Sequence, residues 1–332
     1  MKDVAAACGV TVATVSKALN GHSDISEETR QLVSEKAREL GYLANSAARA
    51  LKTNRTYNIG VLFVDEGGRG LTHEFFAGVL DSFKVEAERN GYDITFINRN
   101  VVDKSTSYLQ HCRYRGVDGV VIICVNFYDP EVQELVSSSL PVVTVDHSFN
   151  NITSVVSDNI VGLETLVRYA YGRGHRKIAY IHGEPTAVTE NRLTGYHRAC
   201  QELGIEVPDG YVKASNYYDA DKGYEATSEL LRLSDPPTCI LFPDDFCLIG
   251  GIRAIYEAGL RIPEDISVMG YDGIVVSQVM TPKITTYRQN CEMLGKTAAA
   301  KLIDQINNPK TTVPERIVVQ GNLVEGESVA VL

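Results

Sequence analysis

From Asn58 onward, short apolar runs alternate with segments whose apolar residues recur at helical spacing. This alternation predicts parallel sheets covered by helices, and a stretch of this length predicts two such units. We expect strands near 59–64, 94–98, 119–124, 142–146, 177–182, 211–215, 238–242 and 266–270. We expect helices near 73–90, 103–115, 129–138, 158–173, 189–204, 220–233 and 245–259.

The N-terminal segment instead reads as short helices. Thr11 is a good N-cap for the second helix, and Gly9 supplies a tight connection of the length that a helix-turn-helix requires. A third helix is expected to begin near Ser26 and to stop at Gly41. Its expected buried face consists of Leu32, Val33, Ala37 and Leu40.

Composition limits the class of protein. The chain has 332 residues, 44% hydrophobic and 22% charged, which is typical of a globular protein with two or three domains. Its apolar runs are far shorter than the roughly 20 residues that cross a bilayer, and it opens with Met1-Lys2-Asp3 rather than an apolar signal segment. We therefore expect a cytoplasmic protein without a membrane partner.

Cysteine and histidine usage gives no sign of a metal site or disulfide framework. The seven cysteines are odd in number, scattered and never spaced as CxxC, and the seven histidines form no obvious cluster. Sequence motifs of common enzymes are also incomplete. Gly68-Arg69-Gly70 lacks the third glycine of a dinucleotide loop, and no GxSxG or GxxxxGK[ST] pattern occurs. We expect no catalytic residues, no metal and no cofactor.

The net charge of -10 argues against a nucleic-acid partner only if the charge is taken over the whole chain rather than by segment. Residues 1–56 carry eight Lys or Arg against six Asp or Glu, whereas the remainder carries 24 against 36. A mildly basic head on an acidic body is therefore compatible with DNA binding by the head.

The head resembles the DNA-binding head of the lactose/galactose repressor family. The matching stretches are KDVAAACGVTVATVSKALNG for the helix-turn-helix, SEETRQLVSEKARELGY for the third helix and NSAARALKTNRT for the hinge. The resemblance implies a second helix that enters the major groove of double-stranded operator DNA by its N-terminal end. By resemblance the DNA-contacting residues are Thr11, Val12, Ala13, Thr14, Ser16, Lys17 and Asn20.

In the hinge, Leu51 matches the family's leucine that wedges into the minor groove, with Lys52 beside it and Ala48 flanking it. The sequence departs from the family pattern at Ala44, where proline usually stands. The alternative for Leu51 is simple packing on the body. For the Thr and Ser residues of the head the alternative is a cap or a solvated group.

The body resembles the family's effector domain, a fold shared with periplasmic sugar-binding proteins. The matching stretches are VVSDNIVG, GHRKIAYIHG, NRLTGYHRA, AGLRIPEDISVMGYDG and TPKITT. The resemblance implies an all-α head followed by two doubly wound α/β lobes. The expected domains are a head over 1–44, a hinge helix and linker over 45–57, and an effector-binding and dimerisation domain over 58–332. Within it, we expect an N-lobe of 58–158 and 289–317, and a C-lobe of 159–287 and 320–332.

Effectors of such domains lie beyond the carboxyl ends of the strands, between the lobes. By resemblance the effector-binding residues are Phe75, Phe76, Asp146, Arg192, Tyr218, Asp244 and Asp272. An arginine and several carboxylates beside aromatic faces can hold the hydroxyls and the flat face of a sugar. The alternatives are a packed core for Phe75 and Phe76, and a cap or turn for Asp272.

The sequence therefore predicts a homodimeric transcriptional repressor that reads a pseudo-palindromic operator and responds to a small molecule, which we expect to be a carbohydrate. A purine or nucleoside is the alternative effector. A sugar receptor without DNA function is the alternative class of protein, although the complete helix-turn-helix pattern opposes it.

Overall fold

The computed structural model describes residues 1–19, 21–42, 55–65, 68–101 and 104–332, and it divides into the units Met1–Tyr57 and Asn58–Leu332. The hinge residues Ala48, Leu51 and Lys52, and Asn20 in the head, lie outside the described residues.

The first unit is built from α1 (Lys2–Cys8), α2 (Val12–Leu19) and α3 (Glu27–Glu39) around a small apolar core. The expected caps form: the Thr14 amide donates to the Thr11 hydroxyl at 3.1 Å, and the Thr29 amide to the Ser26 hydroxyl at 3.2 Å. The expected buried face of α3 is only half right. Val33 and Ala37 are buried, but Leu32 and Leu40 are exposed because three short helices cannot cover the whole apolar stripe.

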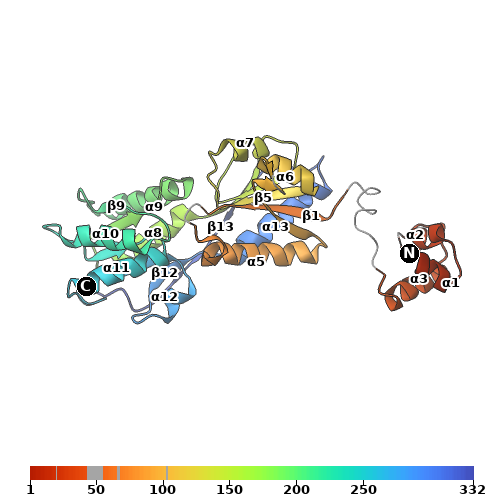
Figure 1. Cartoon of the computed structure of the whole chain (residues 1–332). Helices are drawn as coiled ribbons and strands as arrows, with labels where there is room; N and C mark the ends of the chain where they lie inside the picture. Colours follow the sequence, from red (N-terminus) through yellow and green to blue (C-terminus); the bar gives the residue numbers. More distant parts are fainter. Residues whose placement is uncertain (20, 43–54, 66–67, 102–103) are drawn as a thin grey trace. The chain divides into compact units, whose positions relative to one another are not determined.

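The second unit contains two six-stranded sheets, one in each lobe (Figure 1). The sheet of the N-lobe has the order β13-β7-β6-β5-β1-β2, and all its pairs are parallel. Its strands are β1 (Asn58–Phe63), β2 (Asp93–Ile97), β5 (Gly119–Ile123), β6 (Val142–Val145), β7 (Thr153–Ser157) and β13 (Arg316–Val319).

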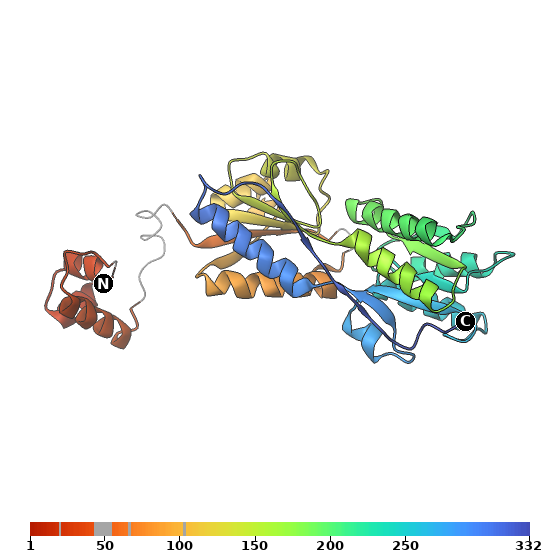
Figure 2. The same ribbon diagram turned by 180° about the vertical axis from the view of Figure 1, so that it is seen from behind.

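Helices cover both faces of this sheet. In Figure 1, α6 (Tyr108–Arg115) and α7 (Pro130–Val136) lie on one face and α5 (Glu74–Arg89) on the other, while Figure 2 shows α13 (Cys291–Asn307) beside α5. Smaller elements are η1 (Gly70–Thr72), β3 (Asn100–Val101) and β4 (Lys104–Ser105). The helix expected from residue 103 starts only at Tyr108, because Ser107 and Gln110 form a capping box there.

The sheet of the C-lobe has the order β14-β12-β11-β10-β8-β9, in which only β14 pairs antiparallel. Its strands are β8 (Ile178–His182), β9 (Val212–Ala214), β10 (Cys239–Leu241), β11 (Ser267–Asp272), β12 (Thr285–Arg288) and β14 (Asn322–Val324). Its helices are α8 (Asn159–Gly172), α9 (Ala187–Leu203), α10 (Ala220–Leu231), α11 (Asp245–Glu257) and α12 (Val275–Val279).

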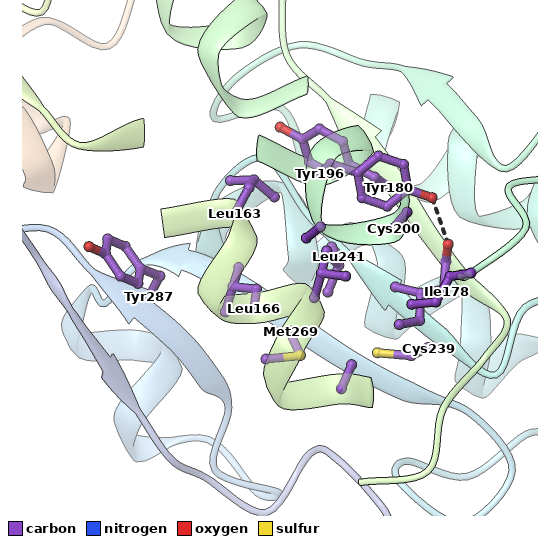
Figure 3. Packing of buried hydrophobic residues seen from close by; sticks show 14 of the residues in the cluster. Leu163, Leu166, Ile178, Tyr180, Tyr196, Cys200, Cys239, Leu241, Met269 and Tyr287 are labelled. Carbon is purple, nitrogen blue, oxygen red and sulfur yellow. Dashed lines mark hydrogen bonds between the residues drawn. The ribbon is translucent and has the colours of Figure 1, made fainter. Parts of the chain in front are cut away.

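Two apolar clusters hold this lobe together, one on each face of the sheet. Figure 3 shows the cluster under α8 and α9, where the buried hydroxyl of Tyr196 donates to the carbonyl oxygen of Ile178 at 2.7 Å. A polar atom inside an apolar cluster is therefore satisfied by the strand itself.

The chain passes between the lobes three times: between β7 and α8, between β12 and α13, and between β13 and β14. The last passage is visible from behind in Figure 2. Each lobe is consequently assembled from segments that are distant in the sequence. The carboxyl ends of the parallel strands of both lobes meet the same space between them.

Candidate functional site

A cavity of about 480 Å³ lies between the two lobes. Its volume is within the usual range for small-molecule sites. The seven expected effector-binding residues all line it: Phe75, Phe76, Asp146, Arg192, Tyr218, Asp244 and Asp272. Their placement follows from the parallel sheets, because most of them follow strands whose carboxyl ends point to the cleft.

Arg192 is the charged centre of the cavity. It lies in the second turn of α9, and it is only 3% exposed. Its Nε donates to Asn159 Oδ1 at 2.7 Å and its Nη1 to the Pro243 carbonyl oxygen at 2.6 Å. The guanidinium carbon also lies 3.6 Å from the centre of the Tyr271 ring, in the geometry of a cation–π contact.

Three carboxylates accompany this single buried guanidinium. Asp272 Oδ1 lies 4.0 Å from Arg192 Nη2 and accepts a hydrogen bond from Gln289 Nε2 at 2.7 Å. Asp146 accepts from the Ser157 amide at 2.7 Å, and burial raises its pKa. Burial and the nearby Asp272 raise the pKa of Asp244 to about 7.

Asp244 also organises the backbone around the cavity. It caps α11 by accepting from the amides of Phe246 and Cys247 at 2.9 and 2.7 Å. Its other oxygen accepts from the amide of Tyr218 at 2.7 Å. Tyr218 has a φ of 59°, a left-handed conformation that costs energy for a residue with a side chain, so this bond offsets the strain.

The ring of Tyr218 is enclosed rather than open to a ligand. Phe246 stacks on it with ring centres 4.2 Å apart and His73 stacks at the same distance, so neither face remains free. The guanidinium of Arg69 lies 4.7 Å from the centre of the Tyr218 ring. Since His73 and Arg69 belong to the N-lobe, this stack joins the two lobes.

The sequence reasoning missed several lining residues. They are His73 at the start of α5, Gln289 in a lobe passage, and the aromatic group Phe127, Tyr128 and His147 in the loops after β5 and β6. Among the described residues, His73 Nδ1 and Gln289 Oε1 are buried without a hydrogen-bond partner. These residues follow parallel strands or directly precede a helix. That position alone could have identified them, although they belong to none of the matching sequence stretches.

The two phenylalanines differ. Phe75 is 5% exposed, so it contributes mainly to the core beneath the cavity, whereas Phe76 is half-buried and packs edge-on to Phe63 with ring centres 5.9 Å apart. Neither observation assigns a ligand contact, but both place an apolar wall beside the charged floor formed by Arg192 and its carboxylates.

In the head, α2 presents an accessible N-terminal face. Thr11, Val12, Ala13 and Lys17 are exposed, while Thr14 and Ser16 are half-buried. Lys17 Nζ forms an ion pair with Asp24 Oδ2 at 2.5 Å. The face is therefore small and weakly charged, with its principal cation already paired inside the head.

Two further observations concern the described part of the chain only. No group of three or more His, Cys, Asp or Glu side chains there is arranged to hold a metal ion. None of the helices found there has the length and apolar character that a bilayer crossing demands.

Comparisons with known proteins agree with this division into head and body. Residues 1–45 match the family described as bacterial regulatory proteins, lacI family, and residues 167–329 match a periplasmic binding protein-like domain. HTH-type transcriptional repressor PurR of Escherichia coli O1:K1 is 32% identical over 99% of this chain and 96% of its own length. The PurR repressor of Pasteurella multocida is 31% identical over 96% and 95%.

Solved structures are similar over the whole chain. A lac repressor dimer bound to operator and the anti-inducer ONPF is 25% identical, with a TM-score of 0.81 over 99% of this chain and 98% of that one. The transcriptional regulator CelR in complex with cellobiose is 28% identical, with a TM-score of 0.72 over 98% of each chain.

A helix-turn-helix head joined to a two-lobed, ligand-binding body defines a DNA-binding transcriptional repressor with an effector domain, not an enzyme. The chain belongs to the LacI family of bacterial regulatory proteins.

Proposed function

We propose that this repressor acts in the cytoplasm as a homodimer that binds a pseudo-palindromic operator. A carbohydrate that enters the cleft changes the affinity of the repressor for this operator, by either weakening or strengthening it. One observation carries the choice of effector: a buried guanidinium with three carboxylates, Asp146, Asp244 and Asp272, lines a cavity of about 480 Å³. Such groups hold several hydroxyls through charge-assisted hydrogen bonds, whereas the carboxylates oppose an anionic ligand.

The domain boundaries given above become part of this proposal. The head over 1–44 reads DNA with Thr11, Val12, Ala13, Thr14, Ser16, Lys17 and Asn20, and the segment 45–57 contributes Ala48, Leu51 and Lys52 at the minor groove. The body over 58–332 binds the effector and dimerises. Dimerisation is needed because one short recognition helix reads too few base pairs for specificity, and a dyad doubles the site.

A nucleoside is the second candidate, supported by a specific feature of the cavity. Its walls are rich in aromatic residues, and the curated relatives at 31–33% identity carry the name PurR. A flat base fits between aromatic rings while a ribose satisfies the carboxylates.

The test combines a thermal-shift screen with operator binding. Sugars and nucleosides are screened for an increase in the melting temperature of the full chain, since a ligand of the native state stabilises it by mass action. Each hit is then added to the protein bound to a duplex selected from a random library. We expect a sugar to change duplex affinity at least tenfold. A hit restricted to nucleosides would replace the carbohydrate with the second candidate.

A further inference from the structure

The cavity has a charged floor and an aromatic rim. Arg192 and Asp272 on the floor are 3% and 8% exposed, whereas Tyr128, which lines the same cavity, is 75% exposed. The cavity therefore extends from buried charged groups to an aromatic side chain that is open to solvent. We call the rim group of Phe127, Tyr128 and His147 the aromatic shelf.

The shelf is built from two neighbouring strands of the N-lobe. Phe127 and Tyr128 follow β5, and His147 follows β6, which pairs with β5. Phe127 and His147 stack with ring centres 4.3 Å apart and planes inclined by 7°. Tyr128 meets the edge of His147 at 6.1 Å, and Phe149 packs behind with its ring 4.7 Å from His147.

Hydrogen bonds preorganise the shelf. The Asn126 side chain accepts from the Tyr128 amide at 3.0 Å, and the Asn126 carbonyl accepts from the Asp129 amide at 3.0 Å, which closes a tight turn with Tyr128 at its tip. The Thr144 hydroxyl donates to the His147 carbonyl oxygen at 2.6 Å. Burial lowers the pKa of His147, so its ring is neutral near pH 7.

The shelf differs from the other aromatic group in the cavity. Both faces of Tyr218 are covered by Phe246 and His73, so that ring closes the cleft and offers no platform. Tyr128 contacts His147 only through an edge-to-face arrangement and keeps most of its surface accessible. A large aromatic side chain held at the rim of a polar cavity suits a second ring with an apolar face.

We infer that the effector has two rings: a polyhydroxylated ring on the floor, carrying at its anomeric carbon a second ring that rests on the aromatic shelf. This inference rests on the proposed function with either of its two effectors, the carbohydrate or the nucleoside, because it presumes that the first ring is a sugar. The second ring has three chemical sources, a further sugar, an aryl group or a nucleobase, which share a flat face and a glycosidic link. The cavity volume of about 480 Å³ accommodates two such rings.

The test compares monosaccharides with their own glycosides by isothermal titration calorimetry on the full chain. The probes are glucose with cellobiose and 4-nitrophenyl β-glucoside, galactose with lactose and 4-nitrophenyl β-galactoside, and ribose with adenosine. In at least one set we expect the glycoside to bind about tenfold more tightly than its monosaccharide. The set, and the glycoside within it, identifies the source of the second ring.

Tyr128→Ala then assigns the gain to the shelf. We expect this variant to bind the glycoside about 3- to 10-fold more weakly and the monosaccharide with unchanged affinity, since it removes stacking only at the rim. Tyr114→Ala is the matched control, because Tyr114 is 63% exposed in the same lobe but does not line the cavity. It should change neither affinity.

Two results would overturn the two-ring effector specifically: monosaccharides that bind as tightly as their glycosides, or a Tyr128→Ala change that weakens both alike. Failure of the proposed function looks different. If no sugar or nucleoside of the thermal-shift screen binds while the protein still binds its selected duplex, the sugar effector is wrong, and the two-ring effector is wrong with it.

Discussion

The guanidinium of Arg192 faces the carboxylate of Asp272 with 4.0 Å between Nη2 and Oδ1. This separation is too long for a direct hydrogen bond, although both side chains are almost completely buried. The hydrogen bonds described for Arg192 use Nε and Nη1, so Nη2 is directed at the gap. A hydroxyl placed there can accept from the arginine and donate to the carboxylate.

The two residues should respond differently to substitution. Arg192→Ala leaves buried carboxylates without their cation and should lower the free energy of unfolding by about 3–5 kcal/mol. Asp272→Asn keeps the size of the side chain and an oxygen that accepts from Gln289. It should therefore preserve the free energy of unfolding but weaken effector binding by 10-fold or more. Urea unfolding and calorimetry with the screened ligand separate these effects. Equal stability of both variants would contradict the structural role of Arg192.

Two buried carboxyl groups of the C-lobe should each lose stabilising free energy as pH rises. Burial, with Asp272 nearby, raises the pKa of Asp244 to about 7 and that of Asp245 to about 8. At these two carboxyl groups the folded protein therefore binds more protons than the unfolded chain between about pH 4 and pH 8. The resulting stabilisation is complete below the unfolded pKa and is lost as pH rises through 7 to 8.

Each group contributes at most about 1.4 kcal/mol per pH unit to this decline. Urea unfolding of the effector domain within the full chain at pH 5, 6, 7 and 8 measures it. The side chain introduced by Asp245→Asn cannot titrate. The variant should therefore show a shallower fall in the free energy of unfolding with pH, by an amount that corresponds to at most one proton. An Asp245→Asn profile that runs parallel to the wild-type profile from pH 5 to 8 would contradict the raised pKa of Asp245.

Two glycines make a matched pair for helix packing. A Cβ on Gly250 of α11 would lie 1.6 Å from the carbonyl oxygen of Ala220 at the start of α10, whereas a Cβ on Gly172 of α8 meets nothing within 4 Å. Gly250→Ala should therefore cost several kcal/mol, of the order of 3. Gly172→Ala should gain up to about 1 kcal/mol through helix propensity. Thermal unfolding of both variants checks the contrast.

Glu74 connects the lobes through a single hydrogen bond. Its Oε1 accepts from the amide of Val275 at 2.7 Å. We expect the lobes to exchange between this arrangement and a more open one, and removing a bond worth about 1 kcal/mol should favour the open one about fivefold. Small-angle scattering should show a larger radius of gyration for Glu74→Ala. Glu88→Ala, which alters the same helix where Glu88 pairs with Lys84, should scatter like the wild type.

In the head, Asp24 restrains the cation of the recognition helix. Lys17→Ala should make the plot of log affinity against log salt shallower by about two for a dimer, because one phosphate contact per head is lost. Asp24→Asn frees Lys17 and should raise affinity for the selected duplex at low salt. Glu39→Gln breaks the comparable pair with Lys36 on α3 and serves as the control. Fluorescence anisotropy measures all three variants.

The fold was predictable from the sequence where the spacing of apolar residues, or the place of a residue after a strand, determines the local structure. Buried strands such as β5 and β6 read directly as apolar runs. Asp146 and Asp244 each follow a parallel strand, one in each lobe, so both were expected at the carboxyl ends of strands that face the cleft. The head helices were also predictable, because their caps are local.

What escaped prediction depends on contacts between distant segments. Tyr218 was expected at the effector site and lines the cavity, but no local pattern encodes the stack that Phe246 and His73 form on its ring. Gln289 reaches Asp272 only because β11 and β12 are neighbours. The exposure of Leu32 likewise follows from the small size of the head rather than from its own helix.

The three passages between the lobes also set an order of assembly during synthesis. The N-lobe sheet needs β13 at one edge and α13 on one face, and both are translated after nearly all of the C-lobe. On the ribosome, the three-helix head can therefore fold first, while the N-lobe waits for residues near 319 and the C-lobe waits for β14 and the buried Val329. A repressor assembled in this order acquires its DNA reader well before its cleft is complete.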